Sequence, residues 1–150
     1  MLNKMYSTTP YTLNDYDFVY NTKKTVYKQY VQANWGEWNE EKQQEMFNSF
    51  IDEYSKDIVI IIKDNHKIGF YHGENIDNNN YEIGNICILP EFQGQSIGTT
   101  ILKNIISQHN TQNIHLQFFK QNPVKNLYLR LGFEIIEELQ YHFKMILKQH

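Results

Sequence analysis

The sequence predicts a single mixed α/β (α+β) domain that spans residues 1–150. The periodicity of the apolar residues gives the order strand, two helices, a three-strand antiparallel meander, helix, strand, helix and final strands. Such a mixture is typical of a sheet covered by helices. The length of 150 residues is usual for one domain. No internal repeat and no linker-like stretch marks a boundary within it.

The first third of the chain predicts one strand and two capped helices. The strand is expected near residues 3–8. Thr12 and Asp15 have the spacing of a capping box, so a helix should begin there, and it should end before Trp35 and Gly36. Asn39 is expected to cap the second helix. The expected inner face of that helix consists of Met46, Phe47, Phe50, Ile51 and Tyr54.

The middle of the chain predicts the meander. The apolar run IVIII and the stretch KIGFYHG are expected to form a hairpin around the turn DNH. The polar tract NIDNNN, residues 75–80, is expected to be a loop without packing. A third strand, YEIGNICIL, should end at Pro90. Beyond it we expect a helix from Ile97, the strand NIHLQFF, a short helix closed by Gly132, and the strands FEIIEEL and HFKMILK.

Composition and charge exclude several classes of protein. Cys87 is the only cysteine, which excludes an intramolecular disulfide and a thiolate zinc cluster. The formal net charge of −3 argues against a nucleic-acid partner. No apolar run approaches the roughly 20 residues of a membrane-spanning helix, and the start MLNKMYSTTP lacks the order of a signal peptide. We therefore expect a cytoplasmic protein without a membrane partner.

The stretch PEFQGQSIGTT, residues 90–100, has the composition of an anion-binding loop. Pro90 ends the preceding strand because it cannot donate to a strand ladder, while Gly94 and Gly98 can adopt a positive φ. A tight turn that leads into a helix presents backbone N–H groups and the positive end of the helix dipole to a ligand. The loop therefore predicts a site for a pyrophosphate.

Two motifs resemble the GNAT (Gcn5-related) N-acetyltransferase family. Gln93 and Gly98 match the cofactor signature Q/R-x-x-G-x-G/A, although Ser96 replaces its middle glycine. Residues 122–133, NPVKNLYLRLGF, resemble the later family segment N-P-A-x-x-L-Y-x-x-L-G-F. The resemblance covers essentially the whole chain. It implies a mostly antiparallel central sheet of six to seven strands with a splayed parallel pair, flanked by about four helices.

The resemblance implies that acetyl-CoA is the co-substrate and that no metal is used. The backbone of Cys87, Ile88 and Leu89 would then bind the pantetheine arm, and Asn122 would bind the cofactor, cap the following helix, or do both. Residues that would hold the pyrophosphate are Gln93, Gly94, Gln95, Ser96, Ile97, Gly98 and Thr99.

The family pattern also suggests the catalytic residues. Tyr128 stands where family members place a general acid, since a phenol with a pKa of about 10 can protonate a departing thiolate. Its alternative interpretation is a core tyrosine. Glu82 is the first candidate for the base that deprotonates the amine, with His72 and His142 as alternatives. A Glu82 side chain that only faces solvent is the competing interpretation.

Trp35 and Trp38 lie between the first two helices and are expected to bind the acceptor amine, with Glu37 beside them. They could equally close the core. The surrounding segment is acidic and favours a small cationic amine. Acetylation of a protein N-terminus or lysine, and a CoA-binding module without activity, are alternative functions. A homodimer through edge strands is a further expectation from the family.

Overall fold

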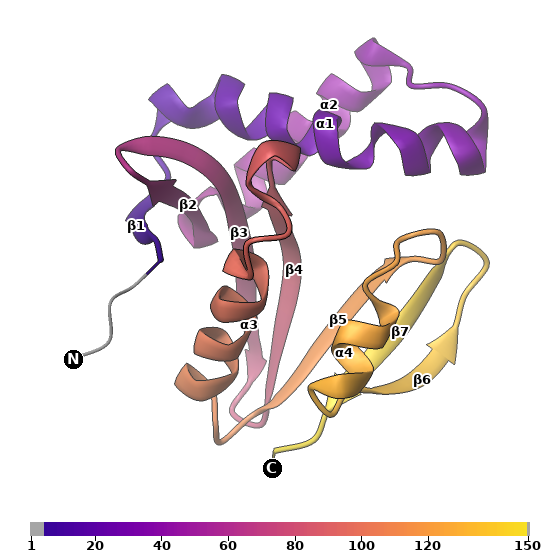
Figure 1. The fold of residues 1–150 in the computed structure, drawn as a ribbon. Coiled ribbons are helices and arrows are strands. Elements are labelled where there is room, and N and C mark those ends of the chain that lie inside the picture. Colours follow the sequence, from indigo (N-terminus) through magenta and orange to yellow (C-terminus); the bar gives the residue numbers. More distant parts are fainter. Residues whose placement is uncertain (1–4, 150) are drawn as a thin grey trace. The chain divides into compact units, whose positions relative to one another are not determined.

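The computed structural model describes residues 5–149, which contain seven strands and four α-helices. The strand order is β1-β2-β3-β4-β5-β7-β6 (Figure 1). Strands β4 and β5 are parallel, and the pairs β1–β2, β2–β3, β5–β7 and β6–β7 are antiparallel. The predicted fold class is therefore confirmed.

The chain forms two compact units, and each is described by itself. The first unit comprises the residues up to His72 together with Asn85–Thr100, and the second comprises Gly73–Gly84 and Ile101–His150. Strands β3 and β4 and helix α3 each contribute residues to both units. The single domain over residues 1–150 stays a prediction.

The strands of the first unit begin with β1 (Ser7–Pro10), which pairs with β2 (Ile58–Lys63). Residues 3 and 4 of the predicted first strand lie outside the described residues, and the strand extends further along the chain than predicted. Strand β3 (His66–Asp77) follows β2 after a tight turn. Asp64 and Asn65 in this turn have φ values of 52° and 65°, the left-handed conformation that matches the twist of a hairpin.

Two helices complete the first unit. A 3₁₀ turn (Leu13–Asp15) leads into α1 (Tyr16–Trp35), and the buried Asp15 carboxylate accepts a hydrogen bond from the Thr12 N–H at 2.9 Å. This confirms the predicted capping box. Helix α1 includes Trp35, one residue more than predicted, and Gly36 follows with a φ of 91°.

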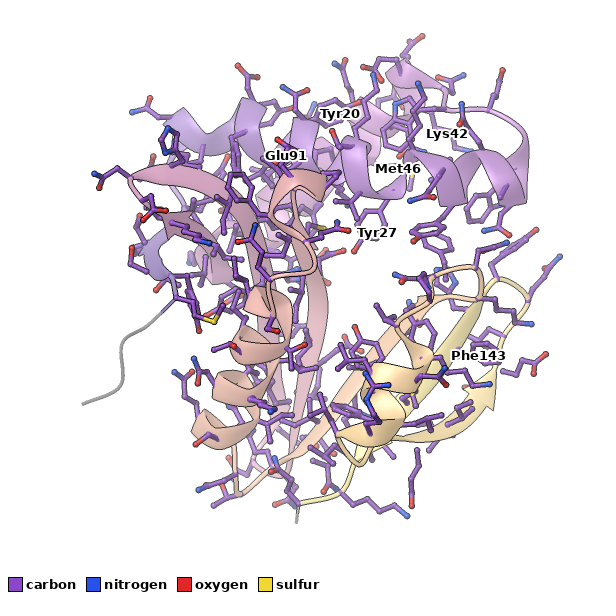
Figure 2. All side chains as sticks on the ribbon, in the orientation of Figure 1. Tyr20, Tyr27, Lys42, Met46, Glu91 and Phe143 are labelled. Atoms are coloured by element: carbon purple, nitrogen blue, oxygen red, sulfur yellow. The ribbon has the colours of Figure 1, made fainter. Side chains whose placement is uncertain are left out.

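Helix α2 (Glu40–Tyr54) begins as predicted, because the Asn39 side chain accepts a hydrogen bond from the Lys42 N–H at 2.9 Å. The prediction for Met46 is wrong: this side chain is 57% exposed and is labelled in Figure 2. The buried stripe is centred on Phe47 and Ile51, and Met46 is one residue, about 100° of helix rotation, away from Phe47. The core of this unit contains Val19, Tyr20, Phe47, Ile51, Ile58, Ile60, Phe70 and Cys87.

The second unit contains the polar tract 75–80, for which the prediction of a loop is wrong. Strand β3 continues to Asp77 and β4 (Asn80–Ile88) begins at Asn80. The buried side chain of Gln112 donates hydrogen bonds to Asn75 Oδ1 at 2.8 Å and to the Asp77 carbonyl at 3.0 Å. These bonds satisfy polar groups that would otherwise need water, so the tract can remain in the sheet.

The remaining elements follow the predicted order. They are α3 (Ile97–Gln108), β5 (Asn113–Phe119), α4 (Lys125–Arg130), β6 (Glu134–Glu138) and β7 (His142–Leu147). Helix α4 is closed, as predicted, by Gly132, which lies two residues beyond its end and has a φ of 101°. The Phe133 N–H donates to the Tyr128 carbonyl at 3.0 Å, a pattern that closes helices before a left-handed glycine.

Candidate active site

The end of β4 is fixed by close backbone contacts within the first unit. A Cβ atom at Gly69 on β3 would lie 2.1 Å from the Cys87 carbonyl oxygen, so only glycine fits there. The Leu89 N–H donates to the Ile68 carbonyl at 2.8 Å, and the Gln93 side chain donates to the Ile88 carbonyl at 2.8 Å. The strand therefore enters the loop in one defined direction.

The loop after β4 contains a 3₁₀ turn (Pro90–Phe92) and two residues with positive φ. These are Gly94 at 77° and Ser96 at 65°. Gly98 was the other residue for which the sequence allowed a positive φ, but it lies inside α3, where the backbone is helical. Ser96 thus adopts the conformation that favours glycine. Its carbonyl accepts hydrogen bonds from the N–H and the hydroxyl of Thr100, at 3.0 and 2.8 Å.

The N–H groups of this loop have the pattern of an anion site. Over residues 5–149, none of the N–H groups of residues 94–99 donates to a protein acceptor, and that of Thr100 is the first to do so. A Cβ atom at Gly94 or at Gly98 would meet nothing within 4 Å. Unpaired donors with open space beside them, at the start of a 12-residue helix, suit a ligand with phosphate groups. The loop therefore fits the pyrophosphate of coenzyme A.

Trp35 and Trp38 lie at the junction of α1 and α2. Trp35 is 50% exposed, and Trp38 is half-buried with its ring N–H donating to Glu40. The Glu40 carboxylate also accepts from the Tyr20 hydroxyl, at 2.9 Å, and pairs with Lys24. Lys24 and the other donors lower the pKa of Glu40. The carboxylate in contact with Trp38 is thus Glu40, and not the Glu37 that the sequence suggested.

A partly buried hydrogen-bond chain links α1, β4 and β3 in the first unit. The hydroxyl of Tyr27, labelled in Figure 2, donates to Asn85 Oδ1 at 2.9 Å, and Asn85 Nδ2 donates to His72 Nδ1 at 3.2 Å. The His72 ring is buried and packs edge-on against Phe50 at 4.9 Å between centroids. Burial, with a smaller effect of Lys23, lowers the pKa of His72 to about 4, so this imidazole is neutral at pH 7.

Lys23 is a residue that the sequence analysis did not identify. Its Nζ lies 4.5 Å from the centre of the Phe50 ring and 6.0 Å from that of Phe47. Burial lowers the pKa of Lys23, and it raises the pKa of the neighbouring Cys87 thiol to about 12. The available signal was spacing: Lys23 comes four residues after the buried Val19 and four before Tyr27, on the inward stripe of α1.

The predicted catalytic residues belong to the second unit. Tyr128 on α4 is half-buried, and its ring lies 5.4 Å from that of Phe118 and 5.7 Å from that of Phe133. Glu82 is half-buried on β4, in parallel register with His115 on β5. The parallel register of β4 and β5 covers Asn80–Glu82 and Asn113–His115.

Two more predicted residues of the second unit have defined contacts. Asn122 Oδ1 accepts a hydrogen bond from the Val124 N–H at 3.3 Å, as a residue that caps the following turn does. His142 lies on the Phe119 ring at 4.3 Å between centroids, and burial lowers its pKa. Among the described residues, no group of three or more His, Cys, Asp or Glu side chains could hold a metal ion. No helix in the described part of the chain is long and apolar enough to cross a membrane.

Comparison with known proteins finds one matching family model and several solved structures with the same fold. Residues 55–135 match the model of the acetyltransferase (GNAT) domain. The PaiA N-acetyltransferase of Thermoplasma acidophilum, solved in complex with coenzyme A, is 19% identical with a TM-score of 0.70, and the match covers 97% of this chain and 99% of that one. No curated protein matches the chain.

Two further solved structures have the same fold. The ribosomal-protein-S18-alanine N-acetyltransferase of Escherichia coli is 16% identical with a TM-score of 0.67, and the match covers 97% of this chain and 94% of that one. A GNAT-family acetyltransferase of Bacillus cereus is 20% identical with a TM-score of 0.64, over 97% of this chain and 99% of that one.

Proposed function

Because the chain belongs to the GNAT acetyltransferase family, we propose that this N-acetyltransferase moves the acetyl group of acetyl-CoA to the primary amine of a small cationic molecule. The observation that carries this proposal is the loop at residues 94–99, whose N–H groups have no protein acceptor within residues 5–149. Phosphate oxygens are the acceptors that such a loop fits best. The protein would act in the cytoplasm, and a homodimer through edge strands is part of the proposal.

The roles of the binding residues follow from their chemistry. The loop from Gln93 to Thr99 would hold the pyrophosphate of acetyl-CoA through the N–H groups of residues 94–99, since the Gln93 N–H already donates to the Pro90 carbonyl. The backbone of Cys87, Ile88 and Leu89 would align the pantetheine arm. Asn122 would contribute a further polar contact. Bound acetyl-CoA supplies an activated acyl group as a thioester, which an unprotonated amine attacks directly.

Proton transfer is assigned to two residues. We propose that Glu82 receives the proton that the acceptor amine must lose, since an alkylamine has a pKa near 10.4 and is mostly protonated at neutral pH. Tyr128 would donate its phenolic proton to the departing thiolate, because the two groups have similar basicity. Each residue would therefore move one proton per turnover.

The acceptor amine would enter near the junction of α1 and α2. Trp35 and Trp38 would offer aromatic faces to an ammonium group. That group would take the place of the Lys24 ammonium, which pairs with Glu40 and lies 6.0 Å from the centre of the Trp38 ring. The aromatic faces attract the cation through the ring quadrupole, and the carboxylate attracts it through its charge. An acceptor that is cationic in solution therefore suits this junction.

The substitution Gly98→Val tests the cofactor loop. A valine there would enter the space beside the unpaired N–H groups, so we expect the affinity for acetyl-CoA, measured by calorimetry, to fall by roughly 100-fold. The thermal midpoint should not fall, because a Cβ atom at this position meets no atom outside its own helix backbone within 4 Å, and valine has a higher helix propensity than glycine. Ser107→Val, on the exposed side of the same helix, is the matched control. Unchanged affinity of Gly98→Val would refute the assignment of the loop.

The substitution Tyr128→Phe tests the proposed acid. We expect kcat for amine acetylation to fall by roughly 100-fold or more with the acetyl-CoA affinity unchanged. A variant with the wild-type kcat would remove Tyr128 from the reaction. An amine panel measured beside a peptide panel decides the acceptor class, and a strong preference for peptides would replace the small-molecule proposal by protein acetylation.

A further inference from the structure

Lys23 places a positive charge in the first unit. In the described part of the chain, none of the ion pairs includes Lys23. Its ammonium group lies over the Phe50 ring, and its charge acts on His72 and Cys87. With pKa values of about 4 and about 12, His72 and Cys87 are both neutral at pH 7. Partly buried charges are usually paired, so this charge calls for an anion that is not part of the protein.

The hydrogen-bond chain beside Lys23 presents a second donor. Asn85 Oδ1 accepts from Tyr27, so the amide nitrogen of Asn85 is the group that faces His72 Nδ1. That nitrogen donates to Nδ1, which therefore carries no proton, and the neutral ring must carry its proton on Nε2. Lys23 and His72 both contact the Phe50 ring. Two donors beside one aromatic ring suit a carboxylate better than an amine.

We propose that Lys23 binds a carboxylate at the far end of the acceptor, with His72 as a second donor. This inference rests on the proposed acetyl transfer and revises one part of it: the acceptor would be an amino acid, a zwitterion with a cationic amine and an anionic far end, and not a molecule with a net positive charge. The Lys23 charge is close enough to lower the pKa of the Cys87 thiol. Cys87 belongs to β4, the strand assigned to the pantetheine arm. A carboxylate at Lys23 would thus anchor the acceptor beside that strand.

The test compares amino acids with amines of similar length that lack the carboxylate. Glycine, β-alanine and γ-aminobutyrate are paired with ethylamine, propylamine and butylamine, and kcat/KM is measured for each with saturating acetyl-CoA. We expect the wild type to prefer one or more of the amino acids by roughly 10- to 100-fold, the range of a charge-assisted hydrogen bond. Lys23→Met should abolish that preference, so that the ratio of kcat/KM between an amino acid and its paired alkylamine falls to about one. Lys23→Arg should retain most of the preference.

Lys28→Met, which removes an exposed charge from the same helix, is the matched control and should keep the wild-type preference. Calorimetric titration of the same amino acids into the protein with bound CoA gives a readout that needs no turnover. A wild type that acetylates alkylamines as efficiently as amino acids would overturn the inference and leave the proposed function intact. An absence of any turnover, combined with amino-acid binding that Lys23→Met abolishes, would overturn the proposed function and leave the carboxylate site.

Discussion

The two units differ in how some of their polar groups are satisfied. In the second unit, the side-chain amide of Gln112 donates to three oxygens, on Asn75, Asp77 and Asn80, and its own oxygen contacts His109 at 2.8 Å. Gln149 also donates to three backbone carbonyls. In the first unit, Lys23 has no anionic partner among the described residues, and the N–H groups of residues 94–99 have no protein acceptor there.

The difference separates polar groups that stabilise the fold from polar groups that are available to ligands. A saturated amide costs stability when it is removed, because the oxygens that it bonded lose their donor. An unpaired charge or N–H group contributes little to the stability of the fold. It contributes free energy to ligand binding, and a bound ligand in turn stabilises the folded protein. Three substitutions, taken in order of decreasing effect, test this distinction.

Gln112→Leu should have the largest effect on stability. It leaves the side-chain oxygen of Asn75 and the carbonyls of Asp77 and Asn80 without this donor, and we expect a loss of about 3 kcal/mol in the free energy of unfolding. Urea denaturation measures it. Gln108→Leu, at the exposed end of α3, should change stability by less than about 0.5 kcal/mol. Equal stabilities of the two variants would contradict the structural role of Gln112, whereas acetyl-CoA affinity should stay the same in both.

The pH dependence of stability should reveal His72. Its pKa is about 4 in the folded protein and about 6.5 in the unfolded chain, so on acidification the unfolded chain binds the proton first. The stabilising effect is complete above about pH 6.5 and is lost as the pH falls toward 4. Between about pH 7.5 and pH 5 we expect wild type to lose about 2 kcal/mol that His72→Gln does not lose.

Denaturation of wild type, His72→Gln and His66→Gln at both pH values checks this prediction. His66 is an exposed residue of β3 and serves as the matched control. Asp15 does not confound the window. Burial raises the pKa of Asp15, but the hydrogen bonds from Lys67 and Thr12 lower it by more than burial raises it. The contribution of Asp15 to stability is therefore lost only below about pH 4. Parallel pH profiles of wild type and His72→Gln would contradict the neutral, buried imidazole.

Ser96→Gly should have the smallest effect and the opposite sign. A φ of 65° strains a serine, and glycine relieves that strain, although glycine also makes the unfolded chain more flexible. We expect a net gain of about 0.5 to 1 kcal/mol, measured by urea denaturation, with acetyl-CoA affinity at least as high as in the wild type. Ser107→Gly, in the helical part of α3, should instead lose about 0.5 kcal/mol. A loss in both variants would show that Ser96 is not strained.

Local features of the fold could be predicted from the sequence because their causes are local. Three helix ends are set by groups within a few residues of one another: the pair Thr12 and Asp15, the cap Asn39, and Gly132. The tract at residues 75–80 was misassigned because the side chain that satisfies it, Gln112, comes from more than thirty residues later. Local propensity carries no information about such a partner.

The same limit applies to the candidate site: its local features could be predicted, but contacts between distant residues could not. The glycines of residues 90–99 and their position between a strand and a helix predicted an anion-binding loop there. The positive φ at Ser96 was not foreseen, because a serine favours other conformations. The environment of Lys23 could not be read from the chain either, since Phe50, His72 and Cys87 come from three different elements.

Burial of Cys87 has a practical consequence for experiments on this protein. Its thiol is fully shielded, and it is the single cysteine of the chain. Dyes that react with thiolates will therefore count the coenzyme released during turnover with no background from the folded enzyme. The same reagents will label Cys87 once β4 leaves the sheet. The rate of labelling therefore measures the rate at which the first unit opens.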